Sequence, residues 1–229
     1  MLLLIQIEPT YAQPILSKTT ENDISFNNLP WYIDYVTIHE KTNNYPFAYT
    51  HFSERISFLG YWNKSYDGLW DFEKNTENCG GSIVVSNLTV AGYKTKFTEL
   101  FFMWNIEGHL YENYNNNGFE NADEALFYAA SYTLDIIDDQ SCYEDIKEKL
   151  INKYGDKFYS GKSKDGEKAY TFWVDTHGAI VAVTNHFGKI NIYYIAPNAE
   201  DRLNEVKEAV KKQMIEIEHR DAKDNMTGL

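Results

Sequence analysis

Oxygen-bearing side chains recur with a regular spacing between Asn113 and Glu124. The calcium loop of an EF-hand presents ligands at positions 1, 3, 5, 9 and 12 around a glycine at position 6. The corresponding residues here are Asn113, Asn115, Asn117, Asn121 and Glu124, around Gly118. Only Glu124 is a carboxylate, and calcium prefers ionised oxygen. We therefore expect an Asn-rich surface loop, since Asn tolerates left-handed backbone, with a calcium site as the alternative.

A group of carboxylates lies where a predicted strand is followed by a predicted helix. Its members are Asp135, Asp138, Asp139, Glu144 and Asp145. Paired carboxylates serve as general acid and base when their environments separate their pKa values, as in glycan hydrolysis. A structural role is the favoured interpretation, because Asp is common in turns and acidic residues favour the positive end of a helix. A glycan-directed hydrolase using Asp138 to Asp145 is the alternative function.

Aromatic residues are the third candidate for a functional site. The chain contains 18 Tyr, 13 Phe and 5 Trp, more ring surface than alternating strands require. Exposed aromatic patches suit protein or carbohydrate partners. The candidate ligand-binding residues are Trp31, Tyr61, Trp62 and Trp70. The competing interpretation, which we favour for most of these rings, is a large aromatic core.

Other catalytic motifs are missing from the sequence. No Gly-x-Ser-x-Gly, Gly-x-x-x-x-Gly-Lys or Gly-x-Gly-x-x-Gly motif occurs, and we predict no cofactor. His177 and His186 are expected at opposite ends of one strand, roughly 30 Å apart, which is too far to share an ion. Cys142 begins a helix, whose dipole lowers a thiol pKa. A half-buried thiol, or a disulfide with Cys79 if the protein is exported, is the favoured interpretation.

Two helices are expected to position these residues. The first runs from about Tyr143 to Tyr154, with a capping box at Ser141 and Glu144 and Gly155 at its end. The second runs from about Ala199 to about Ile217. Its apolar stripe consists of Leu203, Val206, Val210, Met214 and Ile217.

Strand patterns fill the rest of the chain. Between the two helices they cover residues 169–174, 179–185 and 190–195, separated by turns, which predicts an antiparallel meander. The first half repeats this order, with a short helix near 34–41 before strands at 82–90, 97–104 and 126–137. We therefore predict an α+β fold, an antiparallel sheet with helices packed on one face, as a duplicated helix-plus-meander unit.

The predicted domain occupies residues 21–218, with halves at 24–137 and 141–218 and a flexible tail at 219–229. Residues 1–20 are predicted as a leader or the remnant of an export signal, because Met1 to Ile5 is apolar and small residues follow at Thr10 and Ala12. An extracellular or cell-envelope location is the favoured expectation, with the cytoplasm as the alternative. No other run approaches the roughly 20 apolar residues that span a bilayer, so no integral membrane segment is predicted.

The net charge of −13 limits the classes of partner. A negative surface repels phosphate backbones and anionic lipid headgroups, which disfavours nucleic acid and bare membranes. Solubility is a sufficient explanation for this charge, and a cationic partner remains compatible with it.

Two segments carry a resemblance to a group of proteins. Phe26-x-x-Leu29-Pro30-Trp31, together with Tyr143 to Leu150 and Lys153-Tyr154-Gly155, resembles uncharacterised exported proteins of low-GC Gram-positive bacteria. In those proteins a Phe-x-x-Ile-Pro-Trp motif precedes a helix-plus-sheet unit. The resemblance implies export and an α+β fold, and it implies no activity. The function expected from these observations is a non-catalytic binding module for a protein or a cell-wall polymer.

Overall fold

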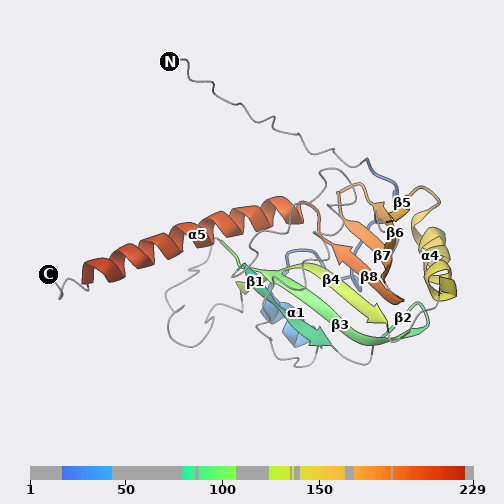
Figure 1. Ribbon diagram of the computed structural model, residues 1–229, viewed down its shortest axis with the longest axis horizontal. Helices are drawn as coiled ribbons and strands as arrows, with labels where there is room; N and C mark the ends of the chain where they lie inside the picture. Colours follow the sequence, from blue (N-terminus) through green and yellow to red (C-terminus); the bar gives the residue numbers. More distant parts are fainter. Residues whose placement is uncertain are drawn as a thin grey trace, which may run out of the picture.

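The computed structural model describes residues 17–42, 79–85, 88–106, 124–134, 136, 140–162, 168–186 and 188–224. This part of the chain forms an antiparallel sheet of eight strands and three helices, which confirms the α+β prediction (Figure 1). The elements are α1 (Tyr35–Thr42), β1 (Gly80–Val85), β2 (Thr89–Val90), β3 (Tyr93–Met103), β4 (Leu126–Leu134), α4 (Gln140–Tyr154), β5 (Tyr159–Lys162), β6 (Lys168–Val174), β7 (Ile180–His186), β8 (Lys189–Ile195) and α5 (Ala199–Asp224).

The strand order places two meanders side by side, with three strands of the path in the first and four in the second. The sheet runs β1-β3-β4-β8-β7-β6-β5, and β2 pairs with β3 beside this path. In each half a helix precedes an antiparallel meander, α1 before β1, β3 and β4, and α4 before β5 to β8. The last strands of the two meanders, β4 and β8, pair at the centre with Ala130 opposite Tyr194. The two halves therefore share one continuous sheet.

The strand register builds an apolar face. It aligns Leu100, Ala130, Tyr194, Val181 and Trp173 in one row across the sheet. Successive side chains of a strand alternate between faces, so Phe102 and Thr171 point to the same side as this row. The ring of Tyr35 on α1 contacts Phe102, and the hydroxyl of Tyr143 on α4 lies 2.9 Å from Thr171 Oγ1. The helices α1 and α4 thus cover the same face.

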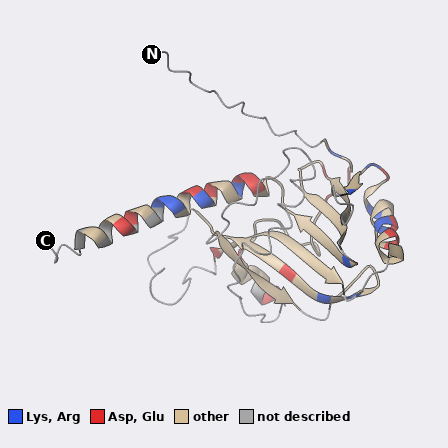
Figure 2. Ribbon diagram, viewed as in Figure 1, with Lys and Arg blue, Asp and Glu red and all other residues tan. Residues whose placement is uncertain are grey.

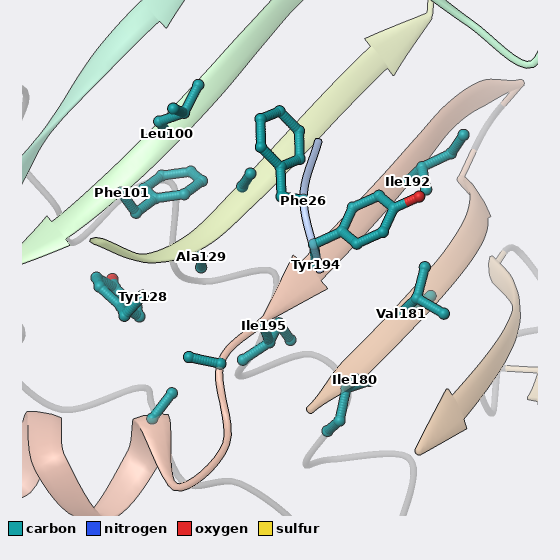
Figure 3. Packing of buried hydrophobic residues seen from close by; sticks show 14 of the residues in the cluster. Phe26, Leu100, Phe101, Tyr128, Ala129, Ile180, Val181, Ile192, Tyr194 and Ile195 are labelled. Carbon is teal, nitrogen blue, oxygen red and sulfur yellow. The ribbon is translucent and has the colours of Figure 1, made fainter. Parts of the chain in front are cut away.

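Phe26 covers this face where β4 and β8 pair. Its ring lies 5.7 Å from Tyr194 and 6.1 Å from Phe127, centre to centre. Figure 3 shows it in front of the sheet beside Tyr194. The aromatic core favoured from composition is therefore present where the structure describes the chain.

The N-terminal segment is tied to the second half. Thr19 and Thr20 donate backbone hydrogen bonds to the carbonyl of Val174, at 2.8 and 3.1 Å. Asp175, buried at the turn after β6, accepts bonds from the backbone N–H groups of Ile24, His177 and Ala179. The contacts of the domain therefore reach into the segment that was predicted as a leader.

Three details differ from the sequence expectations. α4 begins at Gln140, so Ser141 lies inside its first turn and the predicted capping box is wrong; Glu144 instead receives a bond from the Gln140 side chain. β5 was not predicted, because its sequence Tyr-Ser-Gly-Lys has no apolar alternation. α5 continues to Asp224, beyond the predicted end at Ile217.

The buried residues of helix α5 lie in its first half. Ala199, Leu203, Val206 and Val210 are the residues of α5 that are buried among those whose exposure is described. The helix then runs outward beyond the sheet, and Figure 2 shows charged residues of both signs along it. None of the helices in the described ranges is both long and apolar enough to cross a membrane.

Candidate binding site

A hollow of about 460 Å³ opens where the chain enters α1. Its lining combines carboxylate, amide, aromatic and aliphatic side chains, from Tyr32, Ile33, Asp34, Val36, Asn105, Glu124 and Leu126. Volumes of roughly 300–1,000 Å³ are typical of sites that hold small molecules or single side chains, and a few polar groups on an apolar wall are their usual composition. We take this hollow as the candidate site.

Backbone hydrogen bonds hold the two main walls of the hollow together. Tyr32 N–H donates to the carbonyl of Phe127 at 2.8 Å, and Phe127 N–H donates to the carbonyl of Ile33 at 2.9 Å. Tyr35 N–H reaches the carbonyl of Ala125 at 2.8 Å. The segment that enters α1 is therefore fixed against the start of β4, which gives the hollow a rigid frame.

Asp34 lines the hollow and is also the N-cap residue of α1. Its Oδ1 accepts hydrogen bonds from the backbone N–H of Thr37 at 2.7 Å and from Thr37 Oγ1 at 2.8 Å. The bond from the Thr37 N–H lowers the pKa of Asp34, because it stabilises the ionised carboxylate. Asp34 therefore presents a fixed negative charge at neutral pH.

Tyr32 connects the hollow to α5. Its hydroxyl donates to the carbonyl of Pro197, and the guanidinium carbon of Arg202 lies 3.9 Å from the centre of its ring. Burial raises the pKa of Tyr32 to about 12. Its φ of 61° is a left-handed conformation that is strained for a bulky residue and is found preferentially at functional sites.

One exposed apolar side chain lines the hollow. Val36 lines the hollow with 37% of its surface exposed, and Ile106, next to Asn105, is 42% exposed. Over the described ranges, Ile215 of α5 is the one other large apolar residue with comparable exposure. One of these three residues thus lines the hollow, and a second is the sequence neighbour of a lining residue.

One of the predicted candidate residues lines this hollow, and another directly precedes a lining residue in the sequence. Glu124, the last position of the calcium-like loop, lines the hollow and is exposed. Trp31 precedes Tyr32 and is half-buried; its ring stacks on Phe127 at 5.2 Å and its indole N–H donates to the carbonyl of Ile24 at 3.0 Å. These contacts pack Trp31 against Phe127 and Ile24, and it is not among the residues that line the hollow.

The remaining candidates of those two predictions lie outside the described residues. They are Tyr61, Trp62, Trp70, Asn113, Asn115, Asn117 and Asn121. Their predicted roles in ligand and calcium binding stay predictions. In the described part of the chain, no group of three or more His, Cys, Asp or Glu side chains is arranged to hold a metal ion.

Sequence reasoning did not select Asp34, Val36 or Asn105. A signal was available for Asp34, since Asp followed three residues later by Thr at the start of a predicted helix is typical of an N-cap. Asn105 follows β3 and comes close to Asp34 only in the folded chain.

The acidic cluster is only partly described. Asp135, Asp138 and Asp139 lie outside the described residues, whereas Glu144 and Asp145 lie on α4. Asp145 Oδ2 accepts bonds from Lys149 Nζ at 2.5 Å and from the Tyr93 hydroxyl at 2.8 Å. These two donors, Lys149 first, lower the pKa of Asp145. Asp145 therefore attaches α4 to the β2-β3 hairpin, a structural role.

Three other potentially reactive side chains, two thiols and one carboxyl group, are enclosed by the core. Cys79 and Cys142 are both buried, and no disulfide joins them. Burial raises the pKa of Cys79 to about 11, which disfavours the reactive thiolate. Glu99 of β3 is 2% exposed and accepts a hydrogen bond from Ser82 Oγ at 2.7 Å.

Comparison with known proteins adds no relative. No protein-family model matches the chain, and neither a curated protein nor a solved structure matches it. A functional interpretation therefore depends on the geometry of the hollow.

Proposed function

We propose that this protein is a non-catalytic binding module for a protein or a cell-wall polymer, and that the hollow at the entry of α1 is its contact site. The observation that supports this most directly is the composition of the hollow. Fixed polar groups, Asp34 and Asn105 among them, stand beside the exposed side chain of Val36. Such a combination suits recognition, because the polar groups orient a partner and the apolar rim gains from losing contact with water.

The alternative function, a glycan-directed hydrolase, receives less support. It requires two carboxyl groups roughly 5–10 Å apart across a cleft. In the acidic cluster, the described Glu144 is hydrogen-bonded to Gln140, and Asp145 is bonded to Lys149 and Tyr93.

Export to the cell envelope is part of the proposal, and it would place the hollow where wall polymers and surface proteins occur.

The test is to fill the hollow with a larger side chain. Val36→Trp is expected to weaken binding to isolated bacterial cell walls or to members of an immobilised peptide library by about tenfold or more, equivalent to ~1.4 kcal/mol. Ile215→Trp is the matched control, because it makes the same kind of change at an equally exposed apolar residue outside the hollow. Thermal unfolding of both variants verifies that they fold.

Equal binding by the wild type and Val36→Trp contradicts the proposal. So does the failure of the wild type to bind either probe.

A further inference from the structure

The described part of the hollow's lining carries negative charge. Among the described residues that line it, Asp34 and Glu124 are charged and none is Lys, Arg or His; a cation, Arg202, lies next to the lining on the ring of Tyr32. Asp34 is held ionised by Thr37, as described above. The net charge of −13 adds a field that raises the local concentration of cations. The electrostatics of the hollow therefore favour a positively charged occupant.

The apolar part of the lining restricts the shape of that occupant. Ile33, Val36 and Leu126 lie in the same hollow as the two carboxylates. Lysine and arginine side chains combine an aliphatic stem with a charged head, and they bury the stem along apolar surface. A small inorganic cation has no group to place against these three side chains.

The aromatic ring in the lining already has a cation on it within the fold. The guanidinium of Arg202 lies 3.9 Å from the ring centre of Tyr32, which is a cation–π contact. Tyr32 thus shows that the environment at this end of the sheet accepts an arginine head group. The exposed Val36, which also lines the hollow, suits an apolar residue that flanks a basic residue in a partner.

We infer that the hollow receives a lysine or arginine side chain of a protein partner. The inference rests on the proposed binding function and specifies the ligand. It favours protein over wall polymer, because a neutral glycan offers no cation to compensate for covering Asp34 and Glu124.

The test uses three blocked pentapeptides that differ only in a central lysine, arginine or norleucine, flanked by apolar residues. Titration into the labelled full-length protein is expected to shift the amide signals of residues 32–36, 105–106 and 124–126 for the two basic peptides. The affinity of the norleucine peptide is expected to be about tenfold lower, because it lacks the charge. The affinity of the basic peptides is expected to fall as salt is added.

Charge reversal supplies the paired variants. Glu124→Lys is expected to abolish the shifts produced by the basic peptides, whereas Glu218→Lys is expected to leave them unchanged. Both residues are exposed glutamates, and the two substitutions change the net charge equally. Asp34 is left intact, because it caps α1.

Equal affinity for the norleucine and lysine peptides would overturn the inference. It is also overturned if soluble wall fragments, and not the basic peptides, shift the signals of the hollow; the proposed binding function then stands with a different ligand. If neither probe shifts these signals and Val36→Trp has no effect in the binding assay, the proposed function fails with it.

Discussion

Single side chains in this protein often connect segments that are distant in the sequence. Tyr32 contacts Pro197 and Arg202 at the beginning of α5, and Asp175 binds the N–H of Ile24. Asp34 acts over a shorter distance but has two roles, since the same carboxylate caps α1 and lines the candidate site. A change at Asp34 is therefore expected to affect stability as well as binding.

The stability lost when the cap of α1 is removed can be predicted in size and in pH dependence. Asp34→Ala is expected to lower the free energy of unfolding by about 0.5–2 kcal/mol at neutral pH. The folded pKa of Asp34 lies below the unfolded value, so its contribution is present above about pH 4 and is lost as the pH falls through the folded pKa. Urea unfolding of the wild type and the variant should therefore show a difference that shrinks on acidification.

Asp34→Ser is the control for this experiment, because serine caps a helix and does not titrate in this range. A difference between wild type and Asp34→Ala that is as large in acid as at neutral pH would exclude the titration argument.

Specific polar contacts join the elements in addition to the sheet ladder and the shared hydrophobic core. α4 is attached to the β2-β3 hairpin through Tyr93, Asp145 and Lys149, and α5 packs on the domain through its first half. The segment before α1 is attached to β6 and the following turn through Val174 and Asp175. These polar contacts supplement the core packing, and mutation can test each of them separately.

Asp175 is the attachment point of the N-terminal segment. Asp175→Ala removes the acceptor of three backbone N–H groups, two of them on the buried residues Ile24 and Ala179. We expect a loss of about 3 kcal/mol or more in the free energy of unfolding, because unsatisfied buried donors cost ~1–3 kcal/mol each. Relative to the wild type, hydrogen exchange in Asp175→Ala is expected to accelerate more at the amide of Ile24 than at the amides of β7.

Asp175→Asn keeps one acceptor oxygen, so we expect its free energy of unfolding to fall by less than that of Asp175→Ala. If Asp175→Ala changes the unfolding free energy by less than about 0.5 kcal/mol, as an ordinary surface substitution does, the attachment is not formed.

The molecule as a whole buries many phenol groups. Burial raises the pKa of Tyr132 and of Tyr154 to about 12 in each case, and it raises the pKa values of Tyr128 and Tyr194 further. These residues lie in the core that β4, β8 and α4 share. The buried tyrosines therefore make the stability of the fold depend on pH in the alkaline range.

Alkaline pH is expected to destabilise the fold steeply. Unfolded tyrosine ionises near pH 10. Because the folded pKa values are higher, the stability that these residues contribute is complete below about pH 10 and is lost as the pH rises through the folded values. The melting temperature should fall between about pH 10 and 12, together with the appearance of tyrosinate absorbance.

Tyr132→Phe should make this decline shallower, since it removes one of the titrating groups. A melting temperature that stays constant between about pH 9 and 11 would contradict the argument, because the unfolded tyrosines already ionise there.

Local patterns in the sequence were sufficient for the fold class. The stripe of Leu203, Val206 and Val210 predicted the buried face of α5, and alternation predicted β6, β7 and β8 to within one residue. Such patterns work because a helix or strand repeats its buried positions within a few residues of sequence. Where the pattern is missing, as in the four residues of β5, the element was missed.

The site and several contacts were decided only by tertiary structure. The hollow combines residues 32–36, 105 and 124–126, which no local periodicity relates and which the pairing of the α1 entry with β4 brings together. The same packing placed Trp31 against Phe127 and left Cys79 and Cys142 as separate buried thiols. The sequence by itself thus determined the fold class, the elements with a regular apolar pattern and the net charge. Their packing determined which side chains share a cavity, because that depends on contacts between residues far apart in the chain.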